Sequence, residues 1–319
     1  MTGEARALAP GRAEDWEGLR EPLGASLGVP AESLRVTLAY RGELPDSTAI
    51  FLASSAQGDV LGAVLWSPQA VPHAVALSMA KSQAAAALLP PELASRVLVP
   101  RAQGRVAGRS FALLPYCKPL GRLRPLWWLQ RPTVREVVLE WLRGVCHATA
   151  RSVPAAERET AFRQPLARLA AAEAATPGVR VLAQAALERL ADGRWEPRRV
   201  LMHGDLWKGN LMVRAPGRSS DLDWRRRVCL IDWGGSEPQG YAMFDLVRAA
   251  DALRLAPLRL QREVLAHCRA LGCEPPDAAS HLAAGLAHVH SHLGAFPLER
   301  FVDMAEACRQ TLQRAAIAS

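Results

Sequence analysis

The spacing of apolar and polar residues changes character near residue 115. Before that point, short runs rich in β-branched and aromatic residues are separated by turn residues, a pattern typical of strands. We expect strands over residues 35–40, 48–53, 60–66, 97–99 and 110–114. An alanine-rich run over 73–89 predicts one inserted helix, which Pro90 and Pro91 end. The first 30 residues predict a short helical lead-in.

Beyond Pro115 the pattern becomes mainly helical. Helices are expected over about 132–151, 155–176 and 179–192, and again from Phe244 to the end. Thr133 is expected to cap the first of them. Two short apolar strands, 199–202 and 228–231, interrupt the helices and bracket a polar segment.

These two patterns predict an α+β chain with two lobes. We expect a helical lead-in over 1–30, a sheet-rich N-lobe over 31–116 and a larger helical C-lobe over 117–319. A chain of 319 residues is long enough to bury a sizeable core in such an arrangement. A cleft between lobes is a favoured place for a ligand.

Composition narrows the classes of function. The chain has no apolar run of the roughly 20 residues that span a bilayer, and no recognisable secretion signal. Six cysteines without a Cys-x-x-Cys pair fit free thiols in a reducing cytosol, so a cytoplasmic protein is expected. The net charge of +8 comes almost entirely from arginine and follows no nucleic-acid motif. We therefore expect neither a membrane nor a nucleic-acid partner, and the oligomeric state stays open.

The polar segment between the two short strands carries the chemistry. Asp205 and Asn210 lie five positions apart in a loop, and Asp232 ends the next apolar strand. Loops held at strand ends let three oxygen donors converge, and Mg²⁺ takes oxygen ligands together with phosphate groups. A carboxylate in such a loop can orient an acceptor hydroxyl and accept its proton. The pattern predicts phosphoryl transfer, with ordinary turn residues as the alternative.

The run His203-Gly204-Asp205-x-x-x-x-Asn210, followed by Ile231-Asp232-Trp233, resembles the aminoglycoside phosphotransferase and choline kinase group of protein-kinase-like enzymes. The resemblance implies a bilobal fold with a small antiparallel-sheet N-lobe and a larger, mainly helical C-lobe. It also implies a small-molecule acceptor, with ATP or GTP as the co-substrate and Mg²⁺ as the cofactor. By the same resemblance Asp205 is the catalytic base, and Asn210 and Asp232 bind magnesium. His203 would pack beneath the loop, and Asp245 would brace it from the start of a helix.

The resemblance also points to residues that bind the nucleotide. The hairpin loop ending at Ser47 and Thr48 is expected to meet phosphate oxygens, unless it is a plain surface turn. The backbone around Leu114 and Tyr116 is expected to contact the adenine, unless the run is only the end of a buried strand.

The lysine that the family carries on its third strand is replaced by Trp66. Lys81 is the candidate to take its place from the next helix, and a solvated surface lysine is the alternative. Gln83 stands where the family's partner glutamate is expected. These differences keep a second hypothesis open, in which the chain is a pseudokinase or a nucleotide- or ligand-binding protein on the same fold.

Two further features lack a single interpretation. Lys208 lies inside the expected catalytic loop, where it neutralises the transferred phosphoryl group, contacts the acceptor or points to water. His281, His288 and His292 share one helical face. Packing or surface positions are expected for these histidines, with contact to the acceptor as an alternative, because no zinc spacing is present. The acceptor itself is not readable, although the basic composition leans away from cationic aminoglycosides.

Overall fold

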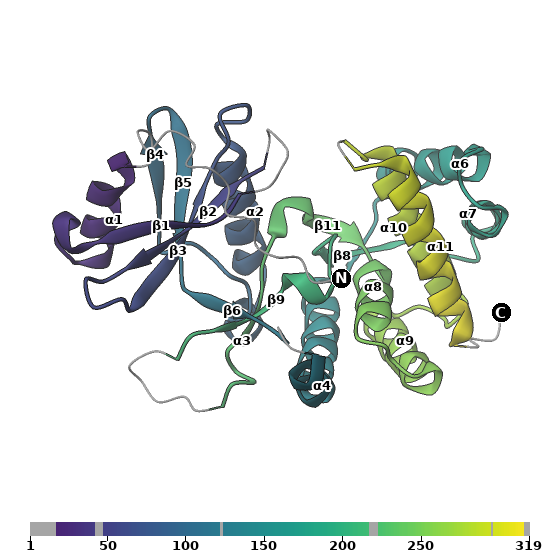
Figure 1. Ribbon diagram of the computed structural model, residues 1–319. Coiled ribbons are helices and arrows are strands. Elements are labelled where there is room, and N and C mark those ends of the chain that lie inside the picture. Colours follow the sequence, from purple (N-terminus) through teal and green to yellow (C-terminus); the bar gives the residue numbers. More distant parts are fainter. Residues whose placement is uncertain (1–16, 42–46, 122–123, 217–222, 295, 316–319) are drawn as a thin grey trace. The chain divides into compact units, whose positions relative to one another are not determined.

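The computed structural model describes residues 17–41, 47–121, 124–216, 223–294 and 296–315 (Figure 1). The chain divides into two compact units. The N-terminal unit comprises Met1–Ala80 and Val99–Cys117, and the C-terminal unit comprises Lys81–Leu98 and Lys118–Ser319. Helix α2 (Ala74–Ala87) contributes its first half to one unit and its second half to the other.

A five-stranded antiparallel sheet forms the N-terminal unit, in the order β1-β2-β3-β5-β4. Its strands are β1 (Arg35–Arg41), β2 (Ala49–Ser54), β3 (Val60–Trp66), β4 (Ala102–Val106) and β5 (Arg109–Leu114). Ala107 and Gly108 join β4 to β5, and both have positive φ angles, of 48° and 75°. Such two-residue turns match the twist of the strands that they connect.

Helix α1 (Arg20–Leu27) contributes to the apolar core of this unit. Leu19 and Leu23 are fully buried in one cluster with Phe51 of β2, Val64 of β3 and Phe111 of β5. In β2, residues alternate between buried and partly buried, so one face of the strand points into this core.

The C-terminal unit is mainly helical, with short strands. Its helices are α3 (Pro91–Ala94), α4 (Arg124–Thr149), α5 (Ala155–Arg158), α6 (Gln164–Ala171), α7 (Pro177–Ala191), α8 (Phe244–Ala252), α9 (Pro257–Leu271), α10 (Asp277–Ser291) and α11 (Leu298–Arg314). Its strands are β6 (Cys117–Pro119), β7 (Arg151–Ser152), β8 (Arg198–Met202), β9 (Leu211–Arg214), β10 (Val228–Leu230) and β11 (Glu237–Tyr241). Helix α10 packs against α6, α7, α8 and α11, and most of its residues are buried.

Two small sheets hold the polar segment in place. One has the order β10-β9-β6 and the other β11-β8-β7. Strand β8 leads into the segment and β9 leads out of it, and β10 ends just before Asp232. Met202 at the end of β8 lies opposite Glu237 at the start of β11. The ends of four strands therefore fix the segments that carry Asp205 and Asp232.

In the sequence before residue 115, one predicted strand is wrong and one strand was missed. Residues 97–99 form no strand; Val97 makes a single bridge to Leu230. The missed strand, β4, has a poorly apolar sequence and owes its conformation to its pairing with β5 across the Ala107-Gly108 turn. Gly108 of this turn was the sequence feature that could have indicated the hairpin.

The expected start of the first long helix is also wrong. Helix α4 begins at Arg124, so Pro132 lies inside it and Thr133 does not cap it. Pro125, in the first turn, is the proline at the tolerated position, because its nitrogen would have no intrahelical acceptor there. The helix expected over 155–176 is interrupted instead: α5 and α6 flank a π-helical turn, Glu159–Arg163, and α6 ends at Ala171.

Within the part of the chain that the structure describes, no helix has the length and apolar character needed to cross a bilayer.

Candidate active site

The loop after β8 is held from below by a buried carboxylate. The backbone N–H groups of His203 and Gly204 donate hydrogen bonds to the two oxygens of Asp245, at 2.5 and 3.1 Å. Asp245 is buried at the start of α8. Burial raises the pKa of Asp245, while His203, the two N–H groups and Arg248 lower it. The carboxylate thus satisfies one buried and one partly buried donor that would otherwise be unpaired.

The His203 side chain ties this loop to the strand that precedes Asp232. Nε2 lies 2.9 Å from the carbonyl oxygen of Ile231, and Nδ1 lies 3.3 Å from the backbone nitrogen of Asp205. Because a carbonyl only accepts and a backbone N–H only donates, the proton belongs on Nε2. The buried ring also packs against Trp233, with ring centroids 4.6 Å apart. His203 therefore lies beneath the loop and links it to the strand that precedes Asp232.

Gly204 allows the loop that carries Asp205 and the segment after Asp232 to approach closely. Its φ angle is +84°, and a Cβ atom there would lie 2.4 Å from the carbonyl oxygen of Gly235. Any other residue would be strained in the backbone and would push the segment after Asp232 away from the loop.

Both oxygens of the Asp205 carboxylate are engaged. Oδ2 accepts a hydrogen bond from the Asn210 side-chain nitrogen at 2.9 Å, and Oδ1 accepts one from Arg248 at 3.3 Å. The same Asn210 nitrogen also donates to the backbone oxygen of Asp205 at 2.8 Å. The side chain of Asp205 is 47% exposed, so it is oriented but still reachable.

Asp232 is a solvent-exposed residue, although neighbouring protein atoms partly desolvate its carboxylate and Asp205 lies close enough for their charges to interact. It occupies the left-handed region at φ +62°, a strained conformation for a residue other than glycine. This partial desolvation raises the pKa of Asp232, and the charge of Asp205 raises it further, whereas His203 and the Gly234 N–H lower it. Because the charge of Asp205 disfavours the ionised form of Asp232, a cation bound here would stabilise the Asp232 carboxylate.

The donor set fits magnesium better than zinc. The Asn210 nitrogen is occupied by Asp205, so its amide oxygen is the atom of this side chain that could serve as a metal ligand, together with the Asp232 carboxylate. Among the described residues, no three His, Cys, Asp or Glu side chains gather into a metal-binding group. Mg²⁺ commonly uses one or two protein oxygens and takes its other ligands from water and phosphates.

A cavity of about 460 Å³ opens beside Asp205, within the usual size range for small-molecule pockets. We call it the Asp205 cavity. Its polar lining consists of Lys81, Asp205, Glu237, Arg248, His288 and His292. Much of the remaining wall is apolar and comes from α8, α10 and α11. Both acids of the lining are paired with its cations, Asp205 with Arg248 and Glu237 with Lys81.

Arg248 and Glu237 were missed by the sequence reasoning. Arg248 lies three positions after Asp245 on α8, on the same helical face, so its approach to the loop was readable from the spacing. Glu237 carried no comparable signal, because its place depends on the pairing of β11 with β8.

The structure does not bring Lys208 into this cavity. Its ammonium group donates to the carbonyl of Gly121 at 3.4 Å and lies 4.6 Å from the ring centroid of Trp127. The histidines of α10 separate into two environments. His281 is buried and accepts a hydrogen bond from Trp195, whereas the rings of His288 and His292 pack together and line the Asp205 cavity.

The candidate nucleotide residues of the N-terminal unit lie at strand ends. Ser47 and Thr48 directly precede β2, whereas residues 42–46 of the hairpin loop lie outside the described residues. Leu114 ends β5 and is buried, and Tyr116 follows it. Trp66, at the position of the family's lysine, is buried beneath the guanidinium of Arg109, 3.5 Å from the ring centroid.

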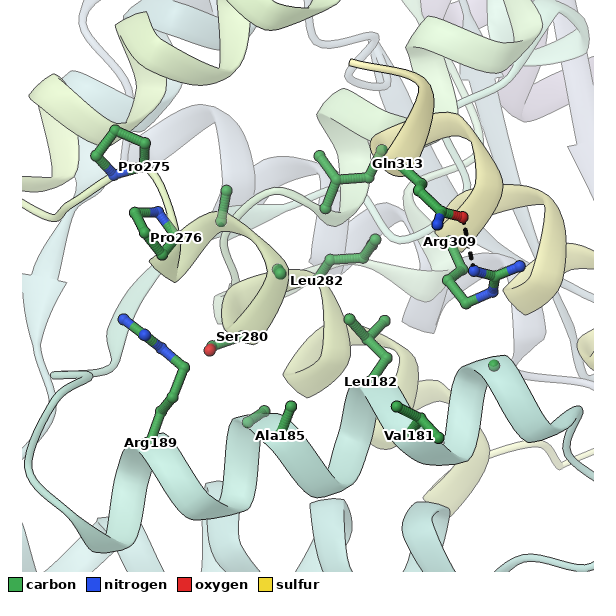
Figure 2. Close-up of a pocket in the computed structure, with 15 residues that line it drawn as sticks. Val181, Leu182, Ala185, Arg189, Pro275, Pro276, Ser280, Leu282, Arg309 and Gln313 are labelled. Atoms are coloured by element: carbon green, nitrogen blue, oxygen red, sulfur yellow. Dashed lines mark hydrogen bonds between the residues drawn. The ribbon is translucent and has the colours of Figure 1, made fainter. Parts of the chain in front are cut away.

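A second hollow lies elsewhere in the C-terminal unit, between α7, α10 and α11 (Figure 2). We call it the α7–α10–α11 groove. Its lining is largely apolar, with Arg189 and Arg309 at its ends, and contains no carboxylate or histidine. It therefore offers no carboxylate or imidazole that could act as a base.

Comparison with known proteins supports the assignment of the fold. The sequence model of the phosphotransferase enzyme family matches residues 66–281. Choline kinase LicA from Streptococcus pneumoniae has a similar structure, with a TM-score of 0.50 and 14% identity, over 92% of this chain and 97% of that chain. This likeness confirms the predicted α+β, protein-kinase-like fold.

Two further structures are similar at lower scores. A thermostable mutant of aminoglycoside phosphotransferase APH(4)-Ia has a TM-score of 0.45 at 14% identity, over 93% of this chain and 99% of that chain. A choline/ethanolamine kinase family protein from Mesorhizobium loti has a TM-score of 0.44 at 14% identity, over 92% and 93%. A search of curated protein sequences gave no match.

Proposed function

Because the chain belongs to the phosphotransferase enzyme family, we propose that it is a kinase that transfers the γ-phosphoryl group of ATP or GTP to a hydroxyl of a small molecule. The observation that carries the proposal is the oriented carboxylate of Asp205 at the cavity, with the Asp232 carboxylate close to it. Asp205 is half exposed and held by Asn210 and Arg248, while Asp232 lies close enough for the charges of the two carboxylates to interact.

In this proposal Asp205 is the base. Its carboxylate is fixed by hydrogen bonds on both oxygens, and each oxygen keeps a lone pair for an incoming hydroxyl. A hydroxyl bound in the cavity would be oriented by Asp205 and would give up its proton to it as the bond to phosphorus forms. The acceptor is thus expected to bind in the Asp205 cavity.

Asn210 and Asp232 would hold Mg²⁺. When bound, this ion neutralises the negative charge of the triphosphate and of the leaving group. His203 and Asp245 would not touch the substrate; they keep the two catalytic segments together through the contacts described above. Lys208 remains a candidate for contact with the phosphoryl group, although its present partners are Gly121 and Trp127.

We assign the nucleotide to an N-lobe over 31–116 and the catalytic loop and acceptor to a C-lobe over 117–319. Ser47 and Thr48 are the proposed phosphate contacts, and the backbone around Leu114 and Tyr116 is the proposed adenine contact. A cytoplasmic location is part of the same proposal, because the nucleotide is found there, and the six cysteines are free thiols.

A specific observation favours a second candidate, a pseudokinase or ligand-binding protein. Trp66 is buried where the family has its lysine, and Lys81 already has two protein partners. Nucleotide binding would then occur without productive transfer.

One experiment separates the two candidates. Purified protein is mixed with Mg²⁺, ATP or GTP, and a panel of small alcohols, sugars, amino alcohols and aminoglycosides, and release of the nucleoside diphosphate is measured. A kinase releases diphosphate with at least one acceptor and loses this activity in Asp205→Ala. Nucleotide binding without any release, across the whole panel and with water as acceptor, would favour the pseudokinase.

A further inference from the structure

Lys81 has two partners next to the segment that carries Asp232. Its ammonium nitrogen donates to the carbonyl oxygen of Ser236 at 3.0 Å and lies 3.5 Å from a carboxylate oxygen of Glu237. All three residues belong to the C-terminal unit. Two of the three N–H groups of the ammonium are therefore engaged by consecutive residues at the start of β11.

These two partners lie where both catalytic segments meet. Glu237 is opposite Met202 in the β11–β8 ladder, and Met202 immediately precedes the catalytic loop. One residue before Ser236, the carbonyl of Gly235 packs against Gly204. Ser236 itself is buried, and its N–H closes a short turn onto Trp233. A displacement of Ser236 and Glu237 would therefore shift both the segment that carries Asp232 and the loop that carries Asp205.

From this geometry we infer that Lys81 is a positioning residue for the magnesium-binding segment and that Glu237 is its required partner. The part of this inference that concerns magnesium rests on the proposed kinase function. Lys81 acts through Ser236 and Glu237, which place the Asp232 carboxylate, and does not act chiefly as a phosphate ligand. The inference assigns a role to Glu237, which no sequence motif indicated. It also explains how a lysine of helix α2 contributes to the site when position 66 holds no lysine.

The Lys81–Glu237 ion pair is weak, which agrees with a role in positioning the neighbouring segment and not in global stability. The side chains of Lys81 and Glu237 are 42% and 39% exposed, and ion pairs at such exposure add little to global stability. Their effect is expected in the local opening of residues 233–241 and in the affinity of Asp232 for its cation.

The test compares Lys81→Met, Glu237→Gln and the double variant. Hydrogen exchange of peptides covering residues 233–241 is measured in the ligand-free protein. Binding of ATP is then measured by calorimetry in EDTA and at a series of Mg²⁺ concentrations. Lys81→Arg, which keeps a cation and several donors, is the conservative variant. Arg163→Met and Glu159→Gln remove a comparably exposed ion pair elsewhere and serve as controls.

If Lys81 is a positioning residue, both single variants speed exchange over 233–241 by about two- to fivefold, and the double variant adds nothing. The Mg²⁺ concentration for half-maximal ATP binding rises about tenfold in all three, whereas ATP affinity in EDTA is unchanged. Lys81→Arg restores most of both effects, and the control variants change neither.

Two results would overturn the inference. In the first, Lys81→Met weakens ATP binding in EDTA while Glu237→Gln does not, which identifies Lys81 as a direct phosphate ligand. In the second, exchange over 233–241 is the same in every variant. If the wild-type protein binds no nucleotide, the kinase proposal fails and the magnesium part of the inference fails with it, whereas the exchange measurement still decides whether Lys81 and Glu237 hold the segment.

Discussion

The C-terminal unit contains two hollows of contrasting character. In the Asp205 cavity, each acid of the lining is paired with a cation of the same lining, and two imidazoles stand beside them. In the α7–α10–α11 groove, the arginines are bound by acids outside the lining, Arg189 by Asp277 and Arg309 by Glu306. The first hollow thus has a network of mutually oriented polar groups, whereas the second has an apolar surface with structural ion pairs at its ends.

The difference shows why an apolar hollow alone does not identify an active site. Phosphoryl transfer depends on oriented charges, because almost all of the catalysis is positioning and electrostatic stabilisation. The Asp205 cavity has a carboxylate held on both oxygens and a second carboxylate, Asp232, nearby.

Replacing the proposed base tests the contrast most directly. We expect Asp205→Ala to lower kcat by about 10²–10⁴-fold, because the acceptor hydroxyl loses its proton acceptor and its orienting group. Nucleotide affinity should be largely kept, which calorimetry with MgATP or MgGTP can check. Asp192→Ala, an exposed acid on another face, is the control. Strong residual turnover in Asp205→Ala would remove Asp205 from the role of base.

Asp232→Asn should separate function from stability. Turnover is expected to lose most of its response to Mg²⁺, because an amide replaces the charged ligand. The ligand-free variant should nevertheless be slightly more stable than the wild type, because partial desolvation and the charge of Asp205 disfavour the ionised carboxylate, whereas solvent screening at this exposed residue keeps the gain small. The pKa of Asp232 is raised, so the wild-type fold loses stability as pH rises from the usual value of 3.8 through the raised one.

Denaturation of both proteins at several pH values, without metal, measures this difference. The gap between wild type and Asp232→Asn should be smallest in acid and should widen to a plateau as pH rises. Addition of Mg²⁺ with ATP should stabilise the wild type only. A difference in stability that does not change with pH would mean that the surroundings of Asp232 do not disfavour its ionised form.

Local spacing explains which parts of this site could be predicted from sequence. Asp205 and Asn210 share one short loop between two strands, and Asp232 ends the next strand, so the order of the residues nearly determines their meeting. The pairing of Lys81 with Glu237 joins residues 156 positions apart, through the approach of α2 to β11. No local pattern encodes such a contact, and Trp66 in the expected place of the lysine did not show where Lys81 would bind.

The same reasoning explains the errors in the fold. Val97-Leu-Val99 has a strong intrinsic preference for strands but finds no strand partner beyond a single bridge. The Ala102–Val106 sequence has a weak preference but is paired along its length with β5. Pairing outweighs propensity at both positions. Turn glycines and first-turn prolines, such as Gly108 and Pro125, were better guides to the element boundaries.

Asp245 is predicted to matter for stability more than for chemistry. In Asp245→Asn, an amide NH₂ would face one of the two backbone N–H groups of His203 and Gly204, leaving that donor buried and unpaired. A loss of about 1–3 kcal/mol in unfolding free energy is expected from this. Urea denaturation measures it. Asp251→Asn, an exposed acid of the same helix, should change stability little, and an equal loss in both variants would contradict the account.

The smallest effects compare one valine from each hollow. Val289 lines the Asp205 cavity, and Val181, which is 68% exposed, lines the α7–α10–α11 groove. Once an acceptor is known, Val289→Ser should raise the acceptor KM about three- to tenfold, because a contact worth about 1 kcal/mol of apolar burial is lost. Val181→Ser should leave both kcat and KM unchanged and should shift stability by less than about 0.5 kcal/mol. A rise in acceptor KM for Val181→Ser, with Val289→Ser silent, would move the acceptor to the groove and reverse the contrast between the two hollows.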